Sequence, residues 1–221
     1  MTSRRPTTRK RTPKRKTGVQ LGIQNVHIMV LMGASKIFAD RGVDAVSVED
    51  ILVAANVSRR TFYKAYKNKA DVLSALYRLG TDRLIEACRR AVAEERELSR
   101  QIERFVDAHV RNARDFGRLM FVLGGEAARQ ESVLHPRRME THARLAELLR
   151  SDAALSGADD LLLRGLLLAI EGVMRIVLEQ CDEGRRVDDA SVERARRVMM
   201  RIATAALASQ GGGAAPVPVA S

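Results

Sequence analysis

Hydrophobic residues recur at intervals of three and four along most of the chain, a spacing that places them on one face of an α-helix. The first such stretch begins at Val26 and runs to Phe38, and Gly42 offers a helix stop. Further helices are predicted from Lys69 to about Val92 (with Leu79 facing inward), from Ser99, from Leu119 to Arg129, from Pro136 to about Leu155, from the residue after Asp160 to Gln180, and from Ser191 to near Ser209. No stretch is long enough to predict a strand, so the pattern indicates an all-α fold.

Two short helices with a tight turn between them are predicted after Gly42. Ser47 is followed three residues later by Asp50, an arrangement that resembles a capping box at a helix start. Asn56 tolerates the left-handed conformation that a tight turn needs, and Ser58 is a favourable cap for the next helix. This arrangement predicts a helix-turn-helix.

The composition fits a globular helical protein. Hydrophobic residues make up 46% of the chain, but aromatic residues only 4%, and there is no Trp. The core is therefore expected to consist of Leu, Val, Ile, Ala and Met. Cys88 and Cys181 are far apart and form no CxxC pair, so neither a disulfide framework nor a structural metal is predicted, and a reducing cytoplasm fits best.

The net charge of +11 is concentrated at the N-terminus. Eight Lys and Arg residues lie within the first sixteen positions, and residues 1–20 contain no acidic residue. Such a block cannot pack, so residues 1–23 are predicted to form a disordered basic arm that binds a polyanion. Nucleic acid and an anionic membrane surface are both candidates, and an organelle transit peptide is a less favoured reading.

A membrane span is not expected. The longest hydrophobic run extends from Leu161 to Leu178, but it contains Arg164, Glu171 and Arg175. Charges at membrane depth cost roughly 2.5 to 3.5 kcal/mol each, so this run is interpreted as a buried helix of a non-membrane protein.

The residues that follow the predicted turn carry the chemistry of DNA recognition. Arg59 or Arg60 can present a guanidinium fork to guanine, and Thr61 can contact a thymine methyl group. The nearby Tyr and Lys side chains offer donors that suit phosphates. The candidate DNA-binding residues are Ser47, Ser58, Arg59, Arg60, Thr61, Tyr63, Lys64, Tyr66, Lys67 and Lys69.

Residues 30–73 resemble the TetR family of bacterial transcription regulators. The likeness is carried by three pieces in combination: Val30-Leu31-x-Gly33-Ala34-x-x-Ile37-Phe38-Ala39-x-Arg41-Gly42, Ser47-Val48-x-x-Ile51, and Ala55-Asn56-Val57-Ser58-x-x-Thr61-Phe62-Tyr63-x-x-Tyr66-x-x-Lys69. The chain departs from the family pattern at Gly33, where Ala is usual, at a cost of roughly 1 kcal/mol of helix propensity. It also departs at Asn56, Ala65 and Tyr66, where Gly, His and Phe are common.

The resemblance implies a three-helix DNA-binding unit with the helix-turn-helix, followed by a larger C-terminal helical bundle that binds an effector and forms a dimer. The corresponding domains are residues 24–84 and 85–209, with a disordered tail at 210–221. The expected partners are a double-stranded DNA operator, a small-molecule effector and a second copy of the chain, with no membrane.

An effector pocket is expected in the C-terminal domain, with Phe105, His109, Phe121 and Met174 as candidate lining residues. Between residues 85 and 210 the only aromatic residues are Phe105, Phe116 and Phe121. The cavity is therefore predicted to be mostly aliphatic, and a flexible hydrocarbon or acyl ligand is favoured over a planar dye.

A dimer interface is expected on the last two helices. Gly165, Ala169 and Gly172 form a stripe of small residues that permits close helix crossing. The last helix presents hydrophobic residues at heptad-like intervals, and the candidate interface residues on it are Val192, Met199 and Ile202.

No enzymatic site is recognisable in the sequence. His27, His109, His135 and His142 are scattered, and there is no GxSxG motif or phosphate-binding Gly loop. No metal or cofactor is expected. The preferred interpretation is a sequence-specific cytoplasmic regulator, a repressor that a small apolar effector releases. The alternatives are an architectural protein that coats DNA with little sequence preference, and a helical enzyme whose site cannot be named.

Overall fold

A computed structural model describes residues 22–179 and 188–208, and within these ranges it contains helices and no strand, which confirms the all-α prediction. The proposed arm up to residue 21, the tail from residue 210 and Cys181 lie outside the described residues. The helices are α1 (Ile23–Arg41), α2 (Val48–Ala55), α3 (Arg59–Phe62), α4 (Lys69–Glu94), α5 (Leu98–Phe116), α6 (Arg118–Ala128), α7 (His135–Arg150), α8 (Asp160–Glu179) and α9 (Asp189–Ala208), with a 3-10 turn at Ala153–Leu155.

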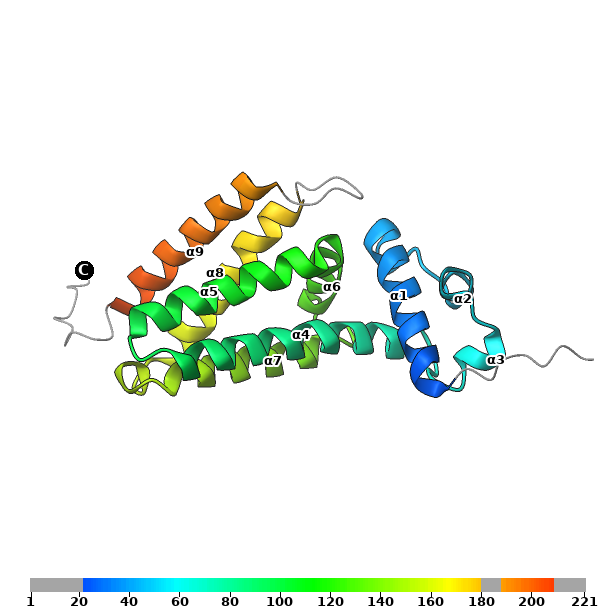
Figure 1. The fold of residues 1–221 in the computed structure, drawn as a ribbon, viewed down its shortest axis with the longest axis horizontal. Helices are drawn as coiled ribbons and strands as arrows, with labels where there is room; N and C mark the ends of the chain where they lie inside the picture. Colours follow the sequence, from blue (N-terminus) through cyan, green and yellow to red (C-terminus); the bar gives the residue numbers. More distant parts are fainter. Residues whose placement is uncertain (1–21, 180–187, 209–221) are drawn as a thin grey trace, which may run out of the picture.

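The helices form a small N-terminal head, α1 to α3, and a larger bundle, α5 to α9 (Figure 1). Helix α4 runs from the head along the bundle and contributes to the hydrophobic cores of both parts. Its first half packs into the head through Val72 and Leu76, and its second half packs into the bundle through Ile85 and Cys88. The change from one core to the other lies between Tyr77 and Ile85.

Helix α6 also joins the two parts. Leu119, Leu123 and Ala127 on one of its faces are buried in the core of the head. Met120 and Phe121 on another face pack against the core of the bundle. A side-chain hydrogen bond strengthens the junction, because Nε of Arg118 donates to the carbonyl oxygen of Ala39 in α1 at 3.0 Å.

Some predicted helix starts are shifted by one or two residues. The α5 helix begins at Leu98 rather than Ser99, and α9 begins at Asp189 because Asp188 caps it by accepting from the Ser191 backbone N–H at 2.8 Å. The side chain of Asp159 caps α8 in the same way, accepting from Leu162 at 3.0 Å.

Two predictions about the bundle are wrong. Helix α7 ends at Arg150, not near Leu155, because Asp152 starts a separate 3-10 turn by accepting from the Ala154 backbone N–H at 2.8 Å. Leu155 is nevertheless buried, on that turn. Leu79 does not face inward but is exposed, because α4 buries Tyr77, Gly80 and Thr81 instead.

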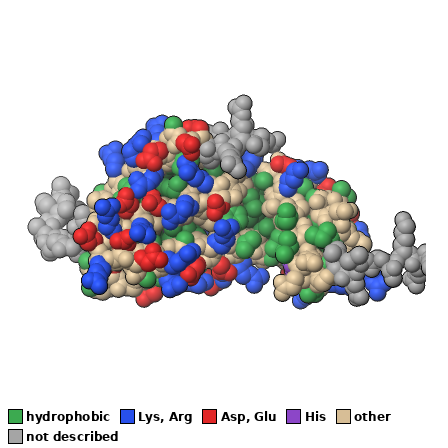
Figure 2. Space-filling model, viewed as in Figure 1, with side chains coloured by type: hydrophobic (Ala, Val, Ile, Leu, Met, Phe, Trp, Pro, Cys, Tyr) green, Lys and Arg blue, Asp and Glu red, His purple; other side chains and the backbone are tan. Residues whose placement is uncertain are grey.

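The described surface is mixed in character. On the face shown in Figure 2, basic and acidic side chains alternate over the bundle, whereas hydrophobic side chains gather where the bundle meets the head. None of the helices in the described ranges is both long and apolar enough to cross a bilayer.

Candidate DNA interface and effector cavity

Helix α2 begins with a complete capping box, as predicted. The Ser47 hydroxyl accepts from the Asp50 backbone N–H at 3.2 Å, and the Asp50 carboxylate accepts from the Ser47 backbone N–H at 2.9 Å. Arg41 at the end of α1 also donates to Asp50, at 2.9 Å. The hydrogen bonds from Ser47, assisted by Arg41, lower the pKa of Asp50 to about 2. The carboxylate therefore stays ionised and fixes the start of α2 against the end of α1.

The turn between α2 and α3 also matches its prediction. Asn56 adopts the left-handed conformation, with φ of 50° and ψ of 46°, and ends α2. Ser58 then caps α3 by accepting from the Thr61 backbone N–H at 3.1 Å. The buried ring of Phe62 anchors this four-residue helix to the head, so its N-terminal residues lie on the surface.

Several candidate DNA-binding side chains lie on that surface. Arg60 is exposed, and no hydrogen bond or ion pair holds it among the described residues. Arg59 is also exposed but pairs with Glu49 of α2. Tyr63 is 49% exposed, and Lys64 and Lys67 are exposed as well. The structure thus brings together two potential base-reading arginines and three potential phosphate contacts.

Two of the predicted phosphate contacts have other surroundings. The ammonium group of Lys69 donates to the carbonyl oxygens of Val43 at 3.0 Å and Val46 at 2.8 Å, so it fixes the loop before α2 rather than facing solvent. Tyr66 is only 6% exposed, and its ring packs edge-on against His27 at 5.0 Å between centroids. Neither side chain is therefore presented to a phosphate.

The position of α2 depends on a close approach to α1 at Gly33. A Cβ atom at this position would lie 2.5 Å from the backbone nitrogen of Ala55 and 2.7 Å from the carbonyl carbon of Ala54. Both are main-chain atoms and cannot rotate away. The glycine therefore permits a helix contact that alanine would obstruct, which offsets its poor helix propensity.

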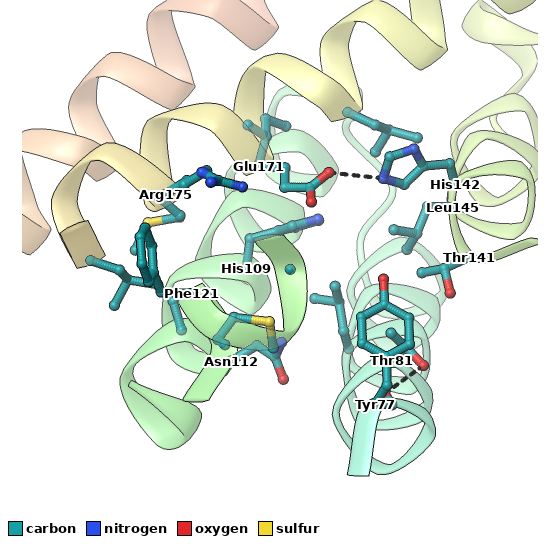
Figure 3. Close-up of a pocket in the computed structure, with 18 of the residues that line it drawn as sticks. Tyr77, Thr81, His109, Asn112, Phe121, Thr141, His142, Leu145, Glu171 and Arg175 are labelled. Atoms are coloured by element: carbon teal, nitrogen blue, oxygen red, sulfur yellow. Dashed lines mark hydrogen bonds and ion pairs between the residues drawn. The ribbon is translucent and has the colours of Figure 1, made fainter. Parts of the chain in front are cut away.

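The bundle encloses a cavity between α4, α5, α6, α7 and α8 (Figure 3). The space that the centre of a water molecule can occupy there is about 100 Å³. By the same measure one water needs roughly 10 to 15 Å³, so the cavity has room for several waters or a small ligand. Most of the wall is aliphatic: Leu84, Leu145, Leu167, Ile170, Met174 and Leu178.

A polar cluster interrupts this wall. Glu171 of α8 accepts from Arg138 at 2.8 Å and 3.2 Å and lies 3.2 Å from Nε2 of His142. Burial alone would raise the pKa of Glu171, but the hydrogen bonds from His142 and Arg138 outweigh burial and hold the pKa below its usual value. Glu171 is therefore ionised inside the bundle, and it is the acidic residue that interrupts the longest hydrophobic run of the sequence.

Three of the four candidate pocket residues, His109, Phe121 and Met174, line this cavity. Phe105 does not line it, because its ring is buried in the core beside His109, with 4.8 Å between ring centroids. Sequence reasoning missed seven polar lining residues: Tyr77, Thr81, Asn112, Thr141, His142, Glu171 and Arg175. Glu171 and Arg175 left a signal, as charged residues on a Leu-rich helix, whereas the other five lie on helices with ordinary polar faces.

The candidate dimer residues divide into two groups. Val192 is 2% exposed and Met199 is fully buried, and both belong to the core of the same chain, so the prediction that they lie in a dimer interface is wrong. Gly165, Ala169, Gly172 and Ile202 keep some exposure. Exposed hydrophobic side chains accompany them on α8 and α9: Leu161, Leu168, Ile176 and Val198.

Within the described ranges, no group of three or more His, Cys, Asp or Glu side chains is arranged to hold a metal ion.

Comparison with known proteins gives both a sequence family and a fold. Residues 30–76 match the model of the bacterial regulatory proteins of the tetR family. No curated protein matches the sequence significantly.

Similar solved structures include the fatty acid degradation regulator FadR from Bacillus halodurans, with 20% identity, a TM-score of 0.66, and coverage of 79% of this chain and 94% of that one. The TetR-family regulator PfmR from Thermus thermophilus has 20% identity, a TM-score of 0.61 and coverage of 78% and 96%. A TetR-family regulator from Streptomyces coelicolor has 16% identity, a TM-score of 0.67 and coverage of 85% and 91%. These chains share the two-part helical fold.

Proposed function

We propose that the chain is a member of the TetR family of bacterial regulatory proteins, whose model residues 30–76 match, and that it is a sequence-specific repressor that leaves its DNA operator when a small molecule binds. The observation that carries the proposal is the exposed N-terminal end of α3. Two arginines lie there at the positive end of a helix, which is an unfavourable place for cations unless an anion comes to meet them. DNA supplies that anion, in the cytoplasm where a regulator of this family acts.

Arg60 is the stronger candidate for reading bases. Its guanidinium is exposed and unpaired among the described residues, so it can contact guanine without first breaking an ion pair. Arg59 would have to exchange Glu49 for DNA. Tyr63, Lys64 and Lys67 surround this end of the helix with donors for phosphates, which set the register of the protein on the duplex.

The cavity supports release by an effector, because the helices of its wall continue into the head. Met120 and Phe121 of α6 face the bundle, while Leu119 and Leu123 of the same helix pack in the head. A ligand that shifts α6 would therefore also shift α1, to which Arg118 is hydrogen-bonded. The spacing of two heads in a dimer would change accordingly.

We assign the dimer contact to the outer faces of α8 and α9. Leu161, Leu168 and Ile176 are exposed there at spacings of seven and eight, and Gly165 and Gly172 lie along the same helix. A Cβ atom at either glycine would meet nothing within 4 Å in the single chain, so the surface is open for close approach of a partner helix.

The rival function is an architectural protein that coats DNA without sequence preference. The decisive experiment measures binding of the full chain to its selected operator and to a random duplex at one fixed salt concentration. We expect Arg60→Ala to weaken operator binding by ~1 to 3 kcal/mol and to relax base preference at one position of each half-site. Random binding should change little.

Arg90→Ala is the matched control, because Arg90 is an exposed arginine on α4, outside both α3 and the helices of the proposed dimer contact. It should leave both affinities unchanged. Equal affinities of the unchanged protein for operator and random DNA would reject the proposal in favour of the architectural function.

A further inference from the structure

A histidine in the cavity wall has one ring nitrogen to which no described residue donates. Nδ1 of His109 lies 2.9 Å from the carbonyl oxygen of Phe105, and because a carbonyl can only accept, Nδ1 carries the proton. Burial lowers the pKa of His109 to about 4, so the ring is neutral at pH 7. Its other nitrogen, Nε2, is then an acceptor, and no described residue donates to it. Figure 3 shows the ring pointing into the cavity.

Two hydroxyl groups beside the cavity are acceptors as well. The Thr81 hydroxyl donates to the Tyr77 carbonyl oxygen at 3.0 Å, and the Thr141 hydroxyl donates to the Arg137 carbonyl oxygen at 2.8 Å. Each proton is therefore used within its own helix, and only oxygen lone pairs remain for a ligand. A bound molecule that contacts His109, Thr81 or Thr141 must therefore bring its own hydrogen-bond donor.

From this arrangement we propose that the cavity binds a mostly hydrocarbon molecule with at least one O–H or N–H group, which donates to Nε2 of His109. The aliphatic wall around Leu167, Ile170 and Met174 holds the hydrocarbon part. The inference rests on the proposed function for its biological meaning, since such a molecule would be the effector.

Two probes with one hydrocarbon skeleton test the proposal on the full-length protein: cyclohexylmethanol and its methyl ether. Dissociation constants are measured at pH 7 by ligand-observed NMR. We expect the alcohol to bind about threefold to tenfold more tightly than the ether, which lacks a donor, because one neutral hydrogen bond is gained.

His109→Phe keeps a ring of similar size but removes the acceptor, so the preference for alcohol over ether should vanish. His135→Phe is the matched control: Nδ1 of His135 also contacts a backbone carbonyl, that of Ala127 at 3.2 Å, but the side chain lies outside the cavity. The preference should persist in this control.

The proposal is overturned if the alcohol binds no more tightly than the ether, or if the preference survives His109→Phe. Should His109→Phe fail to fold, the two probes on the unchanged protein still decide. Operator binding and its response to Arg60→Ala are measured without these probes, so failure of this inference is distinguishable from failure of the proposed repressor function.

Discussion

Helices α1 and α2 approach each other closely at Gly33. We therefore expect Gly33→Ala to destabilise the protein, although alanine has the higher helix propensity. Gly33→Ala would gain roughly 1 kcal/mol in propensity. It would also place a Cβ 2.5 Å from the Ala55 backbone, and overpacking of this kind costs roughly 1 to 3 kcal/mol. We expect a net loss in the free energy of unfolding, measured by urea denaturation.

Gly80→Ala is the control for this prediction, because Gly80 is also inside a helix but has only ordinary contacts, the nearest at 3.5 Å from Met120. Gly80→Ala should stabilise the protein or leave it unchanged. A stabilised Gly33→Ala would show that α2 can move away freely, contrary to the close packing described above.

Lys69 gives a second prediction at this scale. Its ammonium group satisfies the carbonyl oxygens of Val43 and Val46, so Lys69→Met should leave both without this donor and cost roughly 1 to 3 kcal/mol of stability. Thermal unfolding measures the loss. Lys67→Met changes an exposed side chain of the same type and should cost little. Equal losses in the two variants would argue against a structural role of Lys69.

Sequence alone could place these side chains near the DNA interface but could not fix their directions. Arg60 and Lys69 are both basic residues near helix starts, and only the tertiary structure shows that one is exposed while the other reaches back to the loop before α2. Tyr66 is similar, because a Tyr next to lysines suits either a phosphate or the core. Burial, which depends on the packing of distant helices, decides between the two.

At the scale of a helix, the capping box of α2 predicts a stability loss in acid. The pKa of Asp50 is lowered in the folded state to about 2, against an ordinary value of 3.8, so the capping contribution is present above about pH 4 and is lost as the pH falls toward 2. The melting temperature of the unchanged protein should therefore approach that of Asp50→Asn over this range. A constant difference down to pH 2 would contradict the assignment.

Ser47→Ala tests the same cap from its other side and should cost roughly 0.5 to 2 kcal/mol near neutral pH. Because Ser47 and Asp50 act on each other, the double variant should lose less stability than the two single losses added together.

Helix positions are readable from the sequence wherever a local signal exists. Gly42, Asn56 and Ser58 end or begin helices by their own backbone and side-chain chemistry, and the structure shows each in that role. The predicted end of α7 is too late because Leu155 continues the hydrophobic spacing, although it is buried from a separate turn. The double role of α6 has no local signal, since it depends on which cores lie on either side.

At the scale of the whole molecule, the outer face of α8 predicts the oligomeric state. Ile176 is 59% exposed in the single chain, and Ile176→Arg would place a charge in the proposed contact between two copies. We expect this variant to sediment as a monomer and the unchanged protein as a dimer. Val133→Arg is the control, because Val133 is similarly exposed but lies in the connection between α6 and α7. If both proteins sediment alike, the proposed dimer face is wrong.

The two faces of α9 could not be separated from the sequence. Val192 and Met199 recur at the heptad-like spacing that predicts a dimer contact, but the core of a single chain requires the same spacing. A helix packed against its own bundle on one side and a partner on the other carries two hydrophobic stripes. Only the packing of α9 on α5 and α8 shows which stripe is internal.

The shared helix α6 determines how the molecule melts. If the bundle unfolded, the core of the head would lose Leu119 and Leu123 of α6. If the head unfolded, these two residues would be exposed to solvent. Neither part therefore has a complete core of its own, and heat should unfold both in a single cooperative transition. A molecule bound deep in the bundle would then raise the temperature at which the distant helix α3 unfolds.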